Sequence, residues 1–147
     1  MAAAMTPHND RIVVGYDGSP SSKQVLEWAA SHAEETSSTL EVITAWMWPT
    51  SYGAPLALPE DFDATANARA LLEDATNELK RRHPGLRARF ETREGPAASV
   101  LVEASEGAAL LTIGCRGHGG FVGMLIGSVS EHCVAHAHCP VLVFRSS

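Results

Sequence analysis

The sequence predicts one three-layer α/β/α sandwich built on a parallel sheet of five strands. Three observations lead to this fold class. Segments rich in β-branched residues alternate along the chain with segments of helical periodicity. Two of the expected strands are almost wholly apolar, as strands are when helices cover both faces of their sheet. Finally, 147 residues, of which 45% are apolar, suffice for one compact domain with a hydrophobic core.

The net charge and the N-terminal residues exclude some classes of function. The formal net charge is −6 and no basic stripe is present, which argues against a general binder of nucleic acid or anionic membranes. Residues 1–10 lack the regions of a secretory signal, and no apolar run is long enough to span a bilayer. We expect a cytoplasmic protein with a flexible N-terminus at 1–10 and one domain at 11–147, whose partners are small molecules or proteins. Three cysteines, an odd number, fit free thiols.

The first β-α unit runs from Arg11 to the polar segment ETSST. RIVVGY at 11–16 is a short β-branched run of the kind buried in a parallel sheet, and DGSP follows it directly. Ser19 is a favourable N-cap and Pro20 suits the first helical position. Apolar residues then continue at helical spacing to the polar segment ETSST, so a helix should fill this interval.

The second unit begins with TLEVITAW at 39–46, which predicts a strand. Residues 47–61 contain three prolines and a glycine, so they should form a long loop, either a lid over a ligand or a plain connector. A helix is expected at 62–82, where HPG ends it. Its apolar face should contain Phe62, Ala66, Leu72, Ala75 and Leu79.

The remaining elements alternate in the same way. LRARFET at 86–92 alternates apolar and charged residues, which indicates a strand with one face in water at the edge of the sheet. A short helix at 97–107 and an apolar strand at 108–114 follow. SVSEHCVAHAH at 128–138 then predicts a helix, and PVLVFR at 140–145 predicts a last strand. Because helices connect successive parallel strands, ligands should bind beyond the carboxyl ends of this sheet.

Two loops at that end of the sheet hold most of the polar and glycine residues, DGSP after the first strand and GCRGHGG after the fourth. The second loop lacks the lysine of a P-loop and the register of a dinucleotide-binding G-x-G-x-x-G. Its glycines nevertheless bring backbone N–H groups within reach of an anion. Ser128 and Glu131 form an S-x-x-E capping box, which places the N-terminus of a helix at Gly127-Ser128. A phosphate could bind there; alternatively, Ser128 only caps the helix and the glycines only form turns.

The spacing of these residues matches a known family. Gly114-x2-Gly117-x9-Gly127-Ser128 fits the G-x2-G-x9-G-[ST] pattern of nucleotide-binding universal stress proteins, and the stretch 112–145 resembles their C-terminal signature. VVGYDGSPSS resembles their first strand and turn, so the resemblance covers nearly the whole chain. It implies an adenine nucleotide alpha hydrolase-like fold with strand order 3-2-1-4-5. It further implies a homodimer formed through the last strand and ATP as the ligand, with or without Mg²⁺.

The resemblance also implies a set of binding residues. Asp17 would accept hydrogen bonds from the hydroxyl groups of a ribose. An ionised carboxylate accepts from such donors but would repel a phosphate. The alternative is that Asp17 only forms the turn before the helix. Arg116 would neutralise phosphate charge or pair elsewhere on the surface. The implied nucleotide contacts are Asp17, Gly18, Ser19, Thr44, Ala45, Gly114, Arg116, Gly117, His118, Gly127, Ser128 and Val129.

Other kinds of site are less favoured. His132 and His136 have a spacing that can bind zinc, but no C-x2-C accompanies them, so we expect no metal site. Cys115 and Cys133 lack a partner at redox-motif spacing. A flavodoxin-like carrier would need a hydroxyl-rich phosphate loop after the first strand, and DGSPSS does not meet this requirement. The apolar residues at 121–126 should pack against the domain or a partner.

Binding is favoured over catalysis. The two loops offer neither a lysine nor a pair of carboxylates at the position of a transferred phosphate, so we name no catalytic residue. The sequence therefore indicates an ATP-binding regulator or sensor of stress responses with little or no turnover. A weak ATPase or self-phosphorylating activity stays open. A second hypothesis is a structural dimer that pairs through 141–145 and leaves the pocket empty, and the intact glycines favour the first hypothesis.

Overall fold

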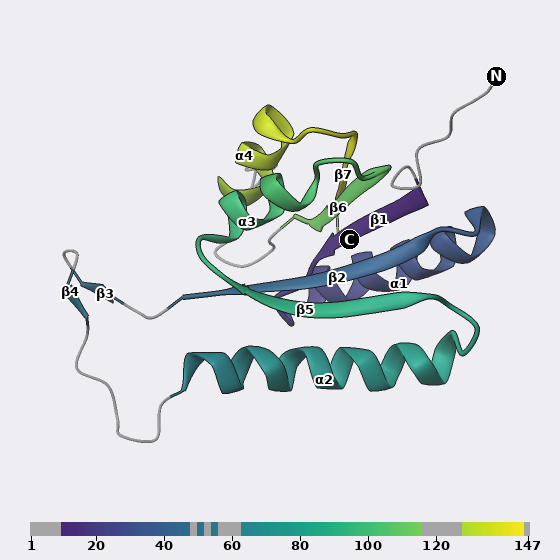
Figure 1. Cartoon of the computed structure of the whole chain (residues 1–147), viewed down its shortest axis with the longest axis horizontal. Helices are drawn as coiled ribbons and strands as arrows, with labels where there is room; N and C mark the ends of the chain where they lie inside the picture. Colours follow the sequence, from purple (N-terminus) through teal and green to yellow (C-terminus); the bar gives the residue numbers. More distant parts are fainter. Residues whose placement is uncertain (1–9, 48–49, 52–53, 56–62, 116–127, 146–147) are drawn as a thin grey trace.

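The computed structural model describes residues 10–47, 50–51, 54–55, 63–115 and 128–145. Within them, five parallel strands form one sheet of order β5-β2-β1-β6-β7, which is 3-2-1-4-5 when only these five strands are counted. Helices cover both faces of the sheet (Figure 1). The predicted fold class is therefore confirmed.

The central strand β1 fixes the register of the sheet. The Cα of Val13 is level with Glu41 of β2 on one side and with Leu111 of β6 on the other. The central residues of β1 are fully buried, as its β-branched sequence predicts. The strands of the sheet are β1 (Arg11–Gly15), β2 (Thr39–Trp46), β5 (Ala88–Glu94), β6 (Leu110–Gly114) and β7 (Val141–Phe144).

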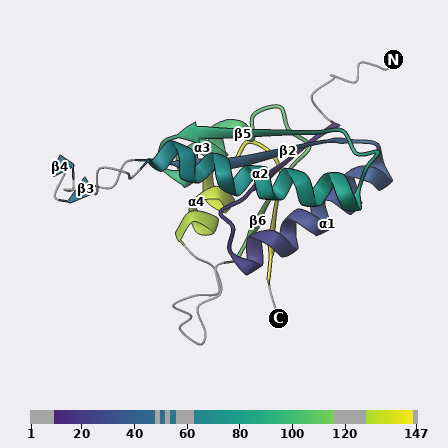
Figure 2. The same cartoon turned by 90° about the horizontal axis from the view of Figure 1, so that it is seen from below.

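Successive side chains of β1 belong to two different cores. Ile12 and Val14 pack with α1 and α2 on one face, which Figure 2 shows from below. Val13 packs with α3 and α4 on the other face. Because strand side chains alternate between faces, one short apolar strand serves both cores. The helices are α1 (Pro20–Thr36), α2 (Ala64–Arg82), α3 (Ala97–Ala104) and α4 (Ser128–His136).

The start and the buried face of α2 differ from the prediction. The helix begins after Asp63, whose Oδ1 accepts the N–H groups of Thr65 and Ala66 at 3.0 and 3.1 Å. Ala66 is exposed, not buried, and Phe62 lies outside the described residues. Apolar spacing alone does not reveal an aspartate cap, which sets where the helix begins. The buried positions of α2 are Ala64, Ala68, Leu72, Ala75 and Leu79.

The alternating pattern of β5 correctly predicted an edge strand. Phe90 packs against the core of α1 and α2, whereas Arg89 and Arg93 lie on the opposite face. The eight-residue α3 packs on α4 and, within the sheet, mainly on β1 and β2, which leaves that face of β5 to charged side chains. The strand starts and ends two residues later than predicted, and β6 starts at Leu110 instead of Ala108.

The long segment after β2 contains an unpredicted hairpin. Thr50–Ser51 (β3) and Ala54–Pro55 (β4) pair in antiparallel fashion. Figure 1 shows this hairpin beyond the carboxyl end of β2, away from the main sheet. The expectation of an irregular loop over 47–61 was therefore wrong at these four residues. Its role as a lid or a connector stays a prediction.

A buried carboxylate joins three strands near their amino ends. Glu41 of β2 is only 4% exposed. Its two oxygens accept from Arg11 of β1 at 2.5 Å and from Arg89 of β5 at 3.2 Å. Arg11 also donates to the carbonyl oxygens of Ala104 and Glu106, at 3.0 and 2.7 Å. Burial of a charge is tolerated when it is paired and hydrogen-bonded in this way.

His83 joins the end of α2 to α1. Its Nε2 lies 2.7 Å from a carboxylate oxygen of Glu27, and its Nδ1 lies 2.8 Å from one of Glu34. Since both neighbours are acceptors when ionised, both ring nitrogens must donate, and the imidazole is protonated. Burial lowers the pKa of His83, but the hydrogen bonds and charges of Glu27 and Glu34 outweigh it, so the pKa is raised.

Replacement of His83 by glutamine should destabilise the protein in a pH-dependent way. Because the pKa of His83 is raised on folding, its contribution is complete below the unfolded value of about 6.5 and is lost as the pH rises through the folded-state pKa. We expect His83→Gln to lower the free energy of unfolding by about 1 kcal/mol at pH 6 and by less at pH 9. Urea unfolding at both pH values measures this, with the exposed His138→Gln as control. A loss that is equal at both pH values would contradict the charged bridge.

Candidate functional site

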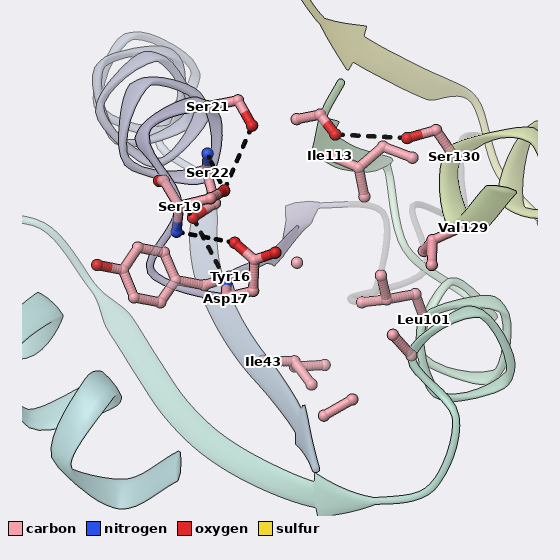
Figure 3. A pocket seen from close by; sticks show the side chains of 14 residues that line it. Tyr16, Asp17, Ser19, Ser21, Ser22, Ile43, Leu101, Ile113, Val129 and Ser130 are labelled. Atoms are coloured by element: carbon pink, nitrogen blue, oxygen red, sulfur yellow. Dashed lines mark hydrogen bonds between the residues drawn. The ribbon is translucent and has the colours of Figure 1, made fainter. Parts of the chain in front are cut away.

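A cavity of about 100 Å³ opens at the carboxyl ends of β1, β2 and β6. Residues of α1, α3 and α4 surround it (Figure 3). In open parallel sheets this edge is where ligands bind, at the point where successive connections run in opposite directions along the sheet. Here that point lies between β1 and β6. The lining residues are Gly15, Tyr16, Asp17, Ser19, Ser21, Ser22, Ile43, Ala45, Ala97, Leu101, Ile113, Gly114, Val129 and Ser130.

A tight turn between β1 and α1 carries the acidic group of the pocket. Gly18 has φ of +81°, a left-handed conformation that favours glycine. The turn brings the N–H of Ser19 to 2.9 Å from Oδ1 of Asp17. Asp17 therefore has the turn role that its sequence position allows, and it also lines the cavity (Figure 3). A carboxylate accepts more than one hydrogen bond, so these two roles are compatible.

The first turn of α1 is closed by its own cap. The hydroxyl of Ser19 accepts the N–H of Ser22 at 3.2 Å, as predicted for an N-cap, and Pro20 has no N–H. The N–H of Lys23 donates to the carbonyl of Ser19 at 3.0 Å. Ser22 in turn donates its hydroxyl to the carbonyl of Ser19 at 3.0 Å. Most donors of this helix end are thus already satisfied within the chain.

Gly114 is required by packing, not by a turn. It is the last residue of β6, as predicted, and its φ lies outside the left-handed range, so the alternative of a turn does not apply at this position. A Cβ added to it would lie 2.8 Å from Oγ and 2.9 Å from the backbone carbon of Ser21. The end of β6 therefore touches the first turn of α1 directly. On the other side, the hydroxyl of Ser130 of α4 donates to the carbonyl of Gly114 at 3.4 Å.

The other side of the cavity is apolar. Ile43 and Ala45 come from β2, Leu101 comes from α3, and Val129 comes from α4. Tyr16 borders the cavity, but its ring belongs to the core of α1 and α2. Figure 3 shows that ring pointing away from Leu101 and Val129. The pocket thus has serines and a carboxylate on one side and aliphatic side chains on the other.

Five of the twelve predicted contacts line this cavity. Thr44 does not, because its hydroxyl is buried and donates to the carbonyl of Tyr16 at 2.9 Å. Gly18 follows Asp17 in the turn but does not line the cavity. Ser128, the first residue of α4, is exposed and does not line it either. Arg116, Gly117, His118 and Gly127, together with the apolar residues at 121–126, lie outside the described residues. The five lining residues are Asp17, Ser19, Ala45, Gly114 and Val129.

Nine of the fourteen residues that line the cavity were not predicted from the sequence. Ile43, Leu101 and Ile113 appear in the sequence as ordinary core residues, and only the topology brings them to one edge. Ser21 and Ser130 had a local signal, since each is a hydroxyl in the first turn of a helix that starts at this edge. The missed lining residues are Gly15, Tyr16, Ser21, Ser22, Ile43, Ala97, Leu101, Ile113 and Ser130.

The described lining of the cavity contains no cysteine. Burial raises the pKa of the Cys133 thiol to about 11, and it also raises the pKa of Cys139. Such thiols are poor nucleophiles at neutral pH. Among the residues that the structure describes, no three or more His, Cys, Asp or Glu side chains gather as metal ligands. No helix in this part of the chain is long and apolar enough to cross a bilayer.

Comparison with known proteins gives a consistent result. The model of the universal stress protein family matches residues 8–145. A universal stress protein of Mycobacterium tuberculosis is 34% identical over 141 residues, which cover 91% of this chain and 47% of that protein. The chain thus spans about half the length of such relatives.

Solved structures of the same family share the fold. One, a universal stress protein in complex with cAMP, is 25% identical with a TM-score of 0.71, and the match covers 94% of this chain and 98% of that one. Another, a universal stress protein family protein from Arabidopsis thaliana with AMP bound, is 22% identical with a TM-score of 0.65, covering 93% and 92%. With a family model that spans almost its full length and relatives above 30% identity, the chain belongs to the universal stress protein family.

Proposed function

We propose that this chain binds ATP and acts in the cytoplasm as a nucleotide-dependent regulator or sensor of stress. The two-sided pocket is the observation that carries the proposal. Ile43, Ala45 and Leu101 offer an apolar surface for a flat base, while Asp17 and the serines offer polar groups for a sugar. The relative whose structure is a complex with cAMP supports an adenine nucleotide as the ligand class.

Asp17 would bind the ribose. One of its oxygens accepts from Ser19, and an ionised carboxylate, which only accepts hydrogen bonds, suits hydroxyl donors. The charge of Asp17 would repel a phosphate at the same place, so the sugar is the better partner. The base would lie against Ala45 and the backbone of Thr44, whose own hydroxyl is engaged with Tyr16.

The phosphates would lie at α4. Two helix N-termini border the cavity, but the cap at Ser19 already satisfies most donors of α1. α4 begins at Ser128, and its second residue, Val129, lines the cavity. Free N–H groups and the helix dipole favour an anion at such an end. The proposed contacts on the phosphate side are Gly114, Arg116, Gly117, His118, Gly127, Ser128 and Val129.

Binding without rapid turnover follows from the side chains available. The described residues that line the cavity include no lysine and only one carboxylate, Asp17, so they offer no pair of carboxylates beside the proposed phosphate contacts Arg116 and His118. Hydrolysis or phosphoryl transfer needs a group that positions the nucleophile and a cation at the transferred phosphate. Slow hydrolysis or self-phosphorylation, with Mg²⁺ brought by the nucleotide, is the alternative within this proposal.

A homodimer through β7 is the second part of the proposal. β7 lies at the edge of the sheet and consists of four half-buried apolar residues. The carbonyl of Pro140, just before β7, accepts from Leu111 of β6 at 2.9 Å, and that of Phe144 accepts from Cys115, just after β6, at 2.8 Å. Alternate residues of a strand bond to the same side, so Val141 and Val143 direct their N–H and C=O groups to the open edge. Apolar edges of this kind pair with a second copy readily.

Nucleotide binding should depend on the charge of Asp17. Asparagine at this position keeps an oxygen for the N–H of Ser19 but loses the negative charge. We expect Asp17→Asn to weaken ATP binding by about ten- to a hundredfold, the value of a hydrogen bond to a charged group. Calorimetric titration with ATP, ADP, AMP and cAMP measures this effect and ranks the ligands.

Asp63→Asn is the matched control, because Asp63 also accepts backbone N–H groups but caps α2, outside the cavity lining. Its affinity for ATP should equal that of the wild type. Failure of all four nucleotides to bind the wild-type chain would refute the proposed function.

Dimerisation should depend on the outward N–H of Val143. Proline there removes one donor from the open edge, whereas proline at Leu142 would instead break the pairing with β6. We expect Val143→Pro to sediment as a monomer and Val143→Thr, which keeps the N–H, to sediment as a dimer. Persistent dimers of a folded Val143→Pro variant would exclude this edge as the interface.

A further inference from the structure

Two histidines on α4 belong neither to the described hydrophobic cores nor to the described lining of the cavity. His132 and His136 lie one helical turn apart, and their ring centroids are 4.4 Å from each other. Both side chains are exposed. Neither ring has a hydrogen-bond or ion-pair partner among the described residues. Because packing does not use these rings, their nitrogens are open to a ligand from solution.

The inner face of α4 is occupied by other residues. Ser130 and Cys133 are buried against the domain, and Val129 and Ser130 line the cavity. Cys133 is fully buried in the core of α3 and α4, so its side chain points away from the exposed face of the helix. His132 and His136 therefore lie on the outer, exposed face of α4, and neither lines the cavity, although Ser128, a proposed phosphate contact, lies one turn before His132 on that face.

Imidazole nitrogens four residues apart on one helix can bind the same metal ion, as they do in the H-x-x-x-H motifs of zinc enzymes. A closed structural zinc site needs four ligands, and the described residues do not bring even three together. An open site needs only two, because water fills the other positions. Imidazole prefers nickel, copper and zinc over magnesium or calcium.

We propose that His132 and His136 form a two-ligand chelate for a divalent ion of the nickel, copper and zinc group on the outer face of α4. The first ion–nitrogen bond holds the ion beside the second ring, which raises the effective concentration of the second ligand. The bound ion would bridge one turn of α4. Cys133 stands where the zinc enzymes of this motif have their glutamate, so the site binds an ion without the base for hydrolysis.

Calorimetric titration of the chelator-treated, nucleotide-free chain with Ni²⁺, Zn²⁺ and Mg²⁺ tests the proposal. We expect one equivalent of Ni²⁺ or Zn²⁺ to bind and Mg²⁺ not to bind. His132→Ala or His136→Ala should each weaken Ni²⁺ binding by roughly a hundredfold, because each removes the chelate effect. His132→Gln, which keeps a polar side chain of similar size, should behave like His132→Ala.

His138→Ala is the matched control. His138 is exposed like the pair, and its backbone N–H, which alanine retains, donates to Ser105 at 2.9 Å. This variant should bind Ni²⁺ as the wild type does. Asp17→Asn should also retain full Ni²⁺ affinity, so the metal site can be tested even if no nucleotide binds. Absence of Ni²⁺ and Zn²⁺ binding by the wild type, or unchanged binding by the folded His132→Ala/His136→Ala double variant, would overturn the proposal.

Discussion

The pocket depends on one close approach between the end of β6 and the first turn of α1. Only a residue without a Cβ fits at Gly114, because its neighbour Ser21 would otherwise lie inside contact distance. This approach sets α1 against the carboxyl edge of the sheet. Since Gly114 also accepts from Ser130, α1 and α4 are positioned by the same peptide unit. The polar side of the cavity, formed by Asp17 and the serines of α1, and the proposed phosphate site at α4 are therefore placed relative to each other by a packing constraint.

Polar groups have different surroundings at the two ends of the sheet. Near the amino ends of the strands, the carboxylate of Glu41 is buried and paired with two arginines, and Arg11 also donates to two carbonyls. A buried charge satisfied in this way holds strands together but offers little to a ligand. At the carboxyl ends, the serines use short-range bonds within α1, and the carboxylate of Asp17 borders an open cavity. The first end supports the fold, and the second leaves room for binding.

How much the sequence could predict varied with how local each signal was. Strands such as β1 and the N-cap at Ser19 follow from a few neighbouring residues, and the structure has both. The strand order came from family resemblance, since local patterns do not determine which strands pair. The N-cap Asp63 was a local signal that the prediction overlooked, and α2 consequently begins at Ala64 instead of residue 62. Leu101 and Ile113 became wall residues only through topology, which no spacing in the sequence records.

The element proposed to hold the phosphates is also lightly anchored. α4 buries only Ser130 and Cys133 among its nine residues, whereas α1 buries seven of seventeen. Segments with few buried contacts open at lower free energy than the rest of a fold, and ligand sites often use them. A ligand that binds only the ordered form of α4 stabilises that form by mass action. A nucleotide on the inner side of α4 and a metal ion on its outer side would therefore act on the same equilibrium, that between the ordered and the opened form of α4. Binding of either ligand would favour the ordered form.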